Sequence, residues 1–153
     1  AELGVIPSMQ ATHATSDKNM AVDRIGDVRI QGAYAWRKLM DAGALIANGS
    51  DFPVESPNPF FGLHASITRQ DKDNDPVGGW YPEERMTDSE AFASFTLDAA
   101  YSGFQESLIG SLEPGKKADF IVLDRDIFAI PDSEIWQAKA LETWVNGTQV
   151  HGK

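Results

Sequence analysis

The chain has 153 residues, of which 42% are hydrophobic and 24% charged, ordinary proportions for one globular domain with a core. Its formal net charge of −10 repels phosphate groups, so nucleic acids and anionic membrane surfaces are poor partners. The sequence contains no cysteine, which excludes disulfides and thiolate ligands and leaves His, Asp or Glu to hold any metal. No stretch approaches the roughly 20 apolar residues of a membrane span, and we expect a cytoplasmic location.

The start of the chain is unusual for a natural domain. It has no Met and no signal-peptide pattern, and it opens directly on the apolar residues 3–6. Domains more often begin with a polar, frayed end. We therefore expect a portion of a longer protein.

The first part of the chain alternates between strand and helix patterns. Residues 4–9 predict a short buried strand, and a polar stretch over residues 10–17 follows. Residues 31–41 have the apolar spacing of a helix covered on one side, and Gly43 suits its C-terminal end. The apolar run 44–47 is typical of a strand buried on both faces. This succession is one unit of an α/β architecture.

The next part is a loop followed by a helix. Residues 53–79 contain several prolines and a pair of glycines, which indicates a long ordered loop with a helical turn over residues 61–68. Residues 87–90, TDSE, are a capping box and predict a helix that ends at Gly103. The side chains expected to be buried along it are Phe92, Phe95 and Ala99.

The end of the chain has the pattern of β-structure. Residues 118–123 predict a strand, and Asn146-Gly147 separates the strand-like residues 141–145 from residues 149–150. Asn-Gly between two such runs favours a type I′ hairpin, because that turn needs positive φ at both central positions. We expect a small antiparallel sheet.

Asp51 is the residue that points most clearly to chemistry. It comes just after the predicted strand 44–47, and α/β barrels display their catalytic groups at the C-terminal ends of strands. The alternative is that Asp51 caps a turn or the following helix. His13 follows the first predicted strand in the same way, so both side chains could point into one cavity. The alternative for His13 is a hydrogen-bonding loop residue.

The other candidates have structural interpretations as well. We expect His64 to pack on a helix face and His151 to lie on the surface. Trp80 and its neighbour Tyr81 could line a substrate pocket, or they could anchor the proline-rich loop to the core.

Two motifs resemble the amidohydrolase superfamily: residues 49–54, GSDFPV, and residues 110–124, GSLEPGKKADFIVLD. Their order and spacing are those expected for that superfamily. Within it, residues 32–41, 51–69 and 78–80 resemble the branch that includes N-substituted formamide deformylases. The resemblance runs nearly end to end.

The resemblance implies a fold and a place in it. Residues 1–109 would be the last strand–helix units of a TIM-like (β/α)8 barrel, about two of its eight. Residues 110–153 would be the C-terminal strands of a small β-sandwich, the composite domain. The chain as a whole would be the C-terminal portion of the enzyme.

The resemblance also implies an activity, the hydrolysis of an amide or related C–N bond in a small molecule by metal-activated water. Asp51 would be both a metal ligand and the catalytic proton carrier, and His13 and Trp80 would contact substrate. The metal would be divalent, with zinc expected in the complete enzyme. The family's His-x-His pair, bridging Lys or Glu and two later histidines have no counterparts in this sequence, so the missing N-terminal portion or self-association would have to complete the enzyme.

Three other interpretations remain open. The chain could be a non-catalytic fragment, or one half of a split enzyme whose missing strands come from a separate chain. It could also be a ligand-binding β-module, in which the aromatic contacts would come from Trp80, Tyr81, Trp136 and Trp144.

Overall fold

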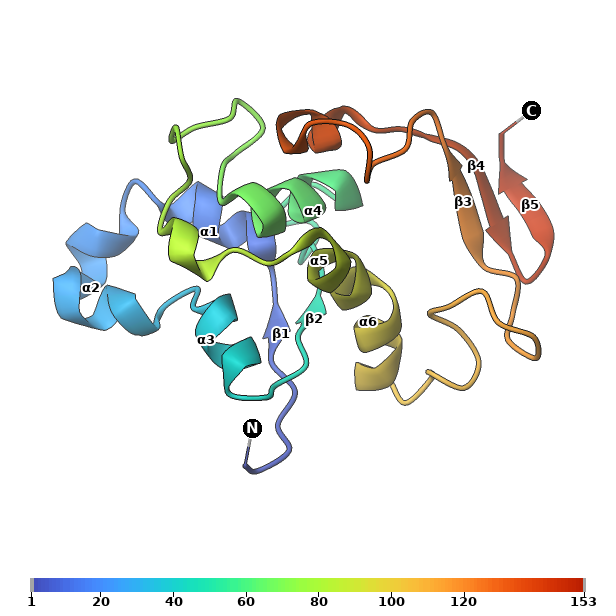
Figure 1. The fold of residues 1–153 in the computed structure, drawn as a ribbon, viewed down its shortest axis with the longest axis horizontal. Coiled ribbons are helices and arrows are strands. Elements are labelled where there is room, and N and C mark those ends of the chain that lie inside the picture. Colours follow the sequence, from blue (N-terminus) through green and yellow to red (C-terminus); the bar gives the residue numbers. More distant parts are fainter. Residues whose placement is uncertain (1, 153) are drawn as a thin grey trace.

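The computed structural model describes residues 2–152 and has an α/β fold with two small sheets (Figure 1). The α-helices are α1 (Ala11–Asp17), α2 (Ala21–Arg29), α3 (Trp36–Asp41), α4 (Pro59–Thr68), α5 (Asp88–Phe95) and α6 (Leu97–Ser102). The strands are β1 (Ser8–Met9), β2 (Ala47–Asn48), β3 (Phe120–Leu123), β4 (Ala140–Val145) and β5 (Thr148–His151). Short 3₁₀ helices cover Ile30–Gly32, Pro82–Glu84 and Asp132–Gln137. Among residues 2–152, the helices do not have the length and apolar character needed to span a membrane.

The first sheet is a parallel pair of strands, with Met9 of β1 opposite Asn48 of β2. Helices α1 to α3 connect them, since parallel neighbours need a long crossover (Figure 1). Both strands are shorter than predicted, because regular pairing occurs only where the two backbones run side by side. The prediction that residues 44–47 are buried on both faces is wrong: Leu45 is 46% exposed.

Residues 11–17 form helix α1, where a polar, loop-like stretch was expected over residues 10–17. Ala11, Ala14 and Thr15 of α1 are buried, and α1 packs against α4. Burial of this one face outweighs the polar composition of the segment.

The helix expected over residues 31–41 begins only at Trp36. Tyr34 has a φ of 53°, which a right-handed helix does not accommodate, and it separates α3 from the preceding 3₁₀ turn. Trp36 itself is 1% exposed and forms part of the core.

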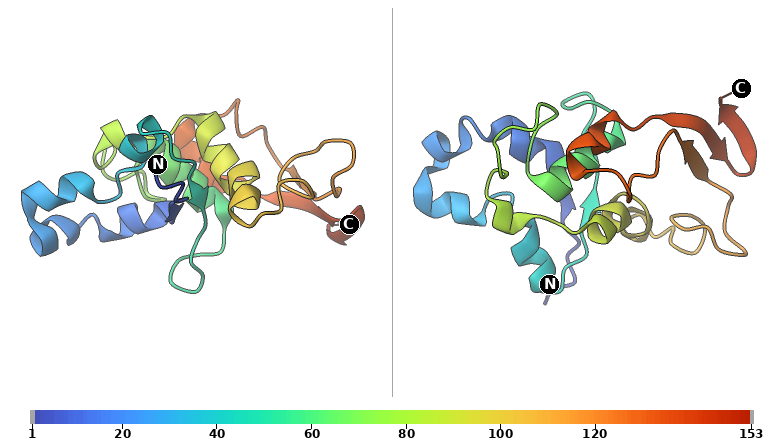
Figure 2. Two further views of the ribbon diagram at one scale, coloured as in Figure 1. Left: turned by 90° about the horizontal axis from the view of Figure 1, so that it is seen from below. Right: turned by 45° about the horizontal axis from the view of Figure 1, so that its top comes forward.

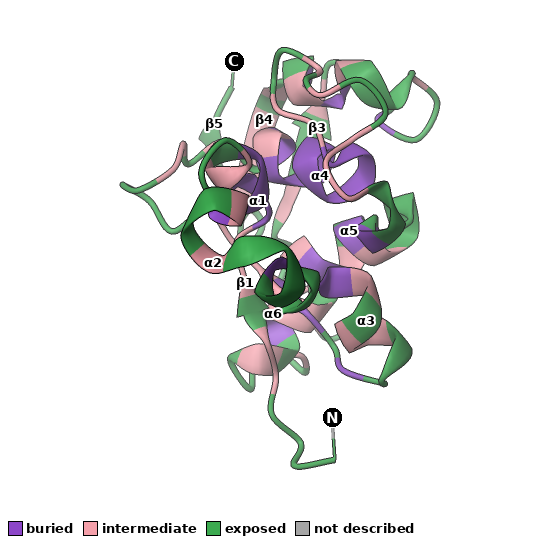
Figure 3. Ribbon diagram, turned by 90° about the vertical axis from the view of Figure 1, so that its left-hand side faces the viewer, coloured by how far each residue is buried: buried purple, intermediate pink, exposed green. Residues whose placement is uncertain are grey.

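Helix α4 is the most buried element, and Figure 3 shows it almost entirely in the buried class. Asn58 caps its start by accepting a hydrogen bond from the Phe60 N–H at 3.0 Å. The predicted helical turn over residues 61–68 is confirmed, and the helix extends it by two residues at the N-terminal end.

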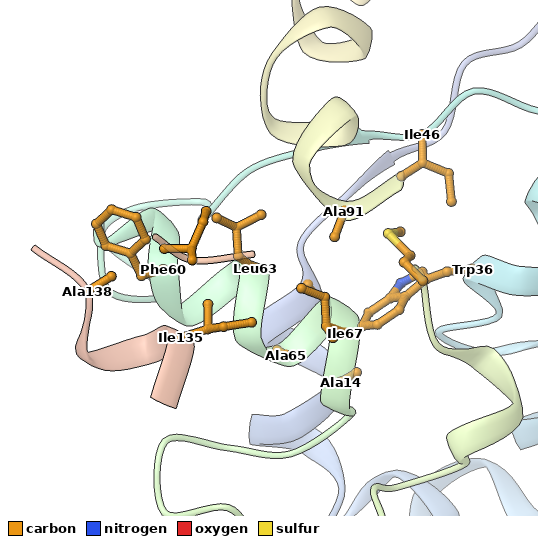
Figure 4. Close-up of a cluster of buried hydrophobic side chains, with 13 residues drawn as sticks. Ala14, Trp36, Ile46, Phe60, Leu63, Ala65, Ile67, Ala91, Ile135 and Ala138 are labelled. Carbon is orange, nitrogen blue, oxygen red and sulfur yellow. The ribbon is translucent and has the colours of Figure 1, made fainter. Parts of the chain in front are cut away.

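The main hydrophobic core surrounds α4 (Figure 4). It joins residues from α1, α3, α4 and α5, the residue directly before β2, and the 3₁₀ segment near residue 135. Its members are Ala11, Ala14, Trp36, Ile46, Phe60, Leu63, Ala65, Ile67, Met86, Ala91, Ile127, Ile135 and Ala138.

The capping box before α5 is confirmed: Thr87 accepts from the Glu90 N–H, and the Glu90 carboxylate accepts from the Thr87 N–H. A single helix as far as Gly103 is wrong, because Thr96 is non-helical and divides it into α5 and α6. Gly103 does end α6. Phe92 is 41% exposed rather than buried, since Ala91 and Ser94 form the buried face of α5.

The second sheet has the order β3–β4–β5 and is antiparallel throughout. The predicted hairpin is confirmed, with φ of 51° at Asn146 and 75° at Gly147. Both views in Figure 2 place this sheet at the end of the molecule opposite α2. Apolar side chains remain exposed on it, at Ile121, Val122, Leu141, Val145 and Val150.

The capping box gains a partner from α3. The Arg37 guanidinium donates to the Glu90 carboxylate, with 3.0 Å between Nη1 and Oε1, and Thr87 donates through its N–H and hydroxyl. These hydrogen bonds, of which the one from Arg37 has the largest effect, lower the pKa of Glu90 to about 2 from its ordinary 4.5. The folded state therefore binds this proton less readily than the unfolded state, so the stabilisation is present above pH 4.5 and is lost as the pH falls toward 2.

We predict that Glu90→Gln lowers the free energy of unfolding at pH 7 by about 1–2 kcal/mol, a value discounted for partial exposure. The difference from the wild type should shrink as the pH falls below 4.5. Urea unfolding at pH 7, 4 and 3 measures it, with the exposed Glu83→Gln as the matched control. A deficit that does not depend on pH would contradict this assignment.

Candidate functional site

The C-terminal ends of β1 and β2 meet at one edge of the parallel pair, and the two main candidate residues follow them. His13 lies in the first turn of α1, directly after β1, and Asp51 lies in the turn after β2. The structure brings these side chains together, with 3.9 Å between His13 Nε2 and Asp51 Oδ2. Parallel pairing produces this proximity, because it places both strand ends on the same side.

Asp51 sits in a turn with a φ of 55°, a left-handed conformation that Asp and Asn tolerate better than most residues. The Val54 N–H donates to the Asp51 carbonyl at 2.8 Å and closes the turn. The Asp51 side chain is 55% exposed, so its carboxylate faces open space. Further along, Glu55 accepts a hydrogen bond from the Ser16 hydroxyl at 2.6 Å, which ties the loop to α1.

The His13 side chain is more buried than that of Asp51. Its side chain is 26% exposed, and its Nε2 atom is buried without a hydrogen-bond partner among the residues that the structure describes. At 3.9 Å, Asp51 is beyond the 2.7–3.2 Å of a normal hydrogen bond. The imidazole and the carboxylate therefore lie close together without a hydrogen bond between them.

The other two histidines have the structural positions predicted for them. His64 is 1% exposed on α4, and its two ring nitrogens lie 3.0 Å from the backbone carbonyls of Asp132 and Asp71. It joins α4 to the 3₁₀ helix Asp132–Gln137 and to the loop that follows α4. His151 is exposed on β5.

Trp80 belongs to a different group of side chains from His13 and Asp51. Its ring packs edge-on against Tyr34 and Tyr81 and lies 5.3 Å from the Arg69 guanidinium carbon. Its carbonyl accepts a hydrogen bond from Arg69 Nε at 2.8 Å. These contacts are those of a loop anchor, and contact between Trp80 and substrate stays a prediction.

Arg69 organises that group. It is fully buried at the end of α4, stacks on Trp36 at 4.2 Å, and donates through Nη1 to the Tyr34 carbonyl at 3.0 Å. Burial lowers the pKa of Arg69 to about 10, which leaves it charged at neutral pH. A planar guanidinium can stack and donate in this way, whereas an ammonium group cannot do both.

Sequence reasoning missed the polar side chains that support the site. Asn48 ends β2 and is hydrogen-bonded to α1 and α4, and Ser16 is bonded to Glu55. The one signal in the sequence was a lone Asn that follows an apolar run and precedes Gly-Ser-Asp. Lys18 is a second case: its ammonium group, 8% exposed, binds Asp71 and Asp75.

The fold is α/β, and a His and an Asp side chain lie side by side at the C-terminal ends of its two parallel strands. The sequence model described as "Amidohydrolase family" matches residues 1–151. The chain therefore belongs to the amidohydrolase family.

Several known proteins are similar to this chain in sequence or structure. The chain is 30% identical over 151 residues to protein LONG AFTER FAR-RED 3 of Arabidopsis thaliana, covering 98% of this chain and 25% of that protein. It is 31% identical over 111 residues to the N-substituted formamide deformylase of Arthrobacter pascens, covering 72% of this chain and 20% of that protein. An uncharacterized metal-dependent hydrolase from Pyrococcus horikoshii has a similar structure, with a TM-score of 0.74 and 29% identity, covering 86% of this chain and 26% of that one. The chain thus spans about a quarter of the length of its relatives.

We predict that Arg69→Lys lowers the free energy of unfolding by about 2–3 kcal/mol, because it leaves buried carbonyls of Tyr34 and Trp80 short of donors. Urea unfolding measures the change, and the exposed Arg24→Lys is the control. A loss within the roughly 0.5 kcal/mol of ordinary surface substitutions would show that Arg69 is not the anchor described above.

Proposed function

We propose that this chain is the C-terminal part of a metal-dependent hydrolase that cleaves amide or related C–N bonds in small molecules. Asp51 is the catalytic group that the chain contributes. The observation that carries the proposal is the pairing of Asp51 with His13 at the common edge of two parallel strands. Membership of the amidohydrolase family supports the reaction class, and the deformylase and the metal-dependent hydrolase among the similar proteins support the bond and the cofactor.

The two sheets support a division of the chain into two parts. We assign residues 1–109, with the parallel pair, to the last units of a TIM-like barrel, and residues 110–153, with the antiparallel sheet, to a small β-sandwich. A two-stranded parallel sheet leaves backbone N–H and C=O groups unpaired on both outer edges, which a barrel closes with further strands. The rest of the protein would supply them, and a cytoplasmic location stays a prediction.

Asp51 could serve as one ligand of a metal site, but the part of the chain that the structure describes does not hold a complete site. Zinc takes at least three protein donors, and residues 2–152 contain no group of three or more His, Asp or Glu side chains placed to bind an ion. The remaining donors would therefore come from the rest of the protein, with Asp51 as an oxygen ligand. A divalent metal bound at such a site supplies Lewis acidity toward the scissile carbonyl.

The residues of this chain carry the proton and help to orient the substrate. The Asp51 carboxylate takes a proton from the attacking water and passes it to the nitrogen of the leaving amine, first as a general base and then as a general acid. Its exposure and its position beside His13 leave room for a substrate between the carboxylate and bulk solvent. His13 then contacts the substrate from α1.

In the complete protein, Asp51→Asn should lower kcat by about 10²- to 10⁴-fold, because an amide does not accept a proton at neutral pH. The fold should persist, since the side chain is more than half exposed. The assay follows amine release from a panel of N-substituted formamides and other N-acyl amines. Asp27→Asn, on the exposed face of α2, is the matched control. A kcat close to that of the wild type in Asp51→Asn would overturn the proposal.

A separate prediction concerns His13. If it contacts substrate, His13→Ala should raise KM about tenfold, equivalent to about 1.4 kcal/mol of binding, and change kcat less. The same amine-release assay over a range of substrate concentrations separates the two constants. A drop in kcat with an unchanged KM would argue against a binding role.

A further inference from the structure

One side chain lies between the two backbone segments that carry the candidate site. Asn48 is the last residue of β2 and precedes the turn to Asp51. Its Oδ1 accepts one hydrogen bond from the Ala11 N–H and another from the Gly49 N–H, each at 3.1 Å. Ala11 begins α1, the helix that carries His13, and Gly49 begins the turn. A single amide oxygen therefore joins both segments.

The other end of the Asn48 amide is fixed to the core. Its Nδ2 donates to the Ser66 hydroxyl at 3.2 Å, and Ser66 is fully buried on α4. The Ser66 hydroxyl in turn donates to the Gly62 carbonyl at 2.9 Å. Only a side chain with an acceptor and a donor in one rigid plane can make all of these bonds.

The bond to Ala11 has no local substitute in α1. The first N–H groups of a helix lack partners within the helix, and a capping side chain usually satisfies one of them. The residue at the cap of α1, Gln10, makes no such hydrogen bond through its side chain. Asn48 supplies the missing acceptor from the neighbouring strand, so the start of α1 is placed by the residue that also starts the Asp51 turn.

We propose that Asn48 is a positioning residue that sets the separation between His13 and Asp51. The inference rests on the proposed function of Asp51. Asn48 acts through backbone N–H groups and has no role in proton transfer. A shift of about 1 Å in a reacting group costs on the order of 100-fold in rate, and loss of a supporting hydrogen bond around a metal site costs about 10- to 100-fold.

The experiment compares kcat and KM for variants of the complete protein in the amine-release assay. Asn48→Ala removes the acceptor and should lower kcat about 10- to 100-fold, with a smaller change in KM. Asn48→Asp keeps the oxygen that faces Ala11 and Gly49, and its second oxygen can accept from the Ser66 hydroxyl once the proton of that hydroxyl turns away from the Gly62 carbonyl. It should therefore restore kcat to within about threefold of the wild type, a rescue that general destabilisation would not produce.

Ser66→Ala is the matched control, because it removes the bond to α4 and leaves both bonds to Oδ1 intact. It should lower stability by about 1 kcal/mol and change kcat less than about twofold. If Asn48→Ala does not fold, Asn48→Thr replaces it: Thr suits a strand, and its oxygen is one bond too short to reach Ala11.

A crystal structure of the variant gives a readout independent of activity. The distance between His13 Nε2 and Asp51 Oδ2, 3.9 Å in this structure, should change in Asn48→Ala and return in Asn48→Asp. An unchanged kcat in Asn48→Ala, together with a large loss in Asp51→Asn, would overturn the positioning role and leave the proposed function standing. Ser66→Ala with a loss equal to that of Asn48→Ala would also overturn it. Full activity in Asp51→Asn would overturn the proposed function, and the positioning role with it.

Discussion

Burial of helix α4 on nearly all sides is the constraint on which the arrangement of this molecule depends. Eight of its ten residues are buried, and α1, α5 and the 3₁₀ segment Asp132–Gln137 pack around it. The contact with α5 is close, because a Cβ at Gly62 would collide with the ring of Phe95. Ser66 and Thr68 donate their hydroxyls to carbonyls of the same helix, so the polar residues of α4 are compatible with burial.

The position of α4 determines where the candidate site forms. Helix α1 packs against α4, which places His13, and the Oδ1 atom of Asn48 joins the start of α1 to the start of the turn with Asp51. The packing of α1 against α4 and the hydrogen bonds of Asn48 thus both determine where the candidate site lies. Because Asn48 bonds to both segments, the separation of the two side chains does not depend on the exposed loop alone.

Polar interactions with buried partners position the long loop after α4. Arg69 is held between Trp36 and Trp80, and Lys18 at the end of α1 binds the carboxylates of Asp71 and Asp75. These contacts anchor the loop at both ends of the segment over residues 69–80. The loop after α4 is thereby joined to α1 and to the core.

Local patterns in the sequence were sufficient to predict the elements that depend only on neighbouring residues. The Thr87–Glu90 capping box and the Asn146-Gly147 turn depend on residues within a few positions of one another, and both are confirmed. Asp51 was located by its place after an apolar run, and the motifs over residues 49–54 and 110–124 were enough to indicate the amidohydrolase family. The helix over residues 11–17 and the role of Asn48 depend on contacts with distant parts of the chain. Burial against α4, rather than local propensity, accounts for them, and a sequence alone does not show which residues far apart in the chain become neighbours.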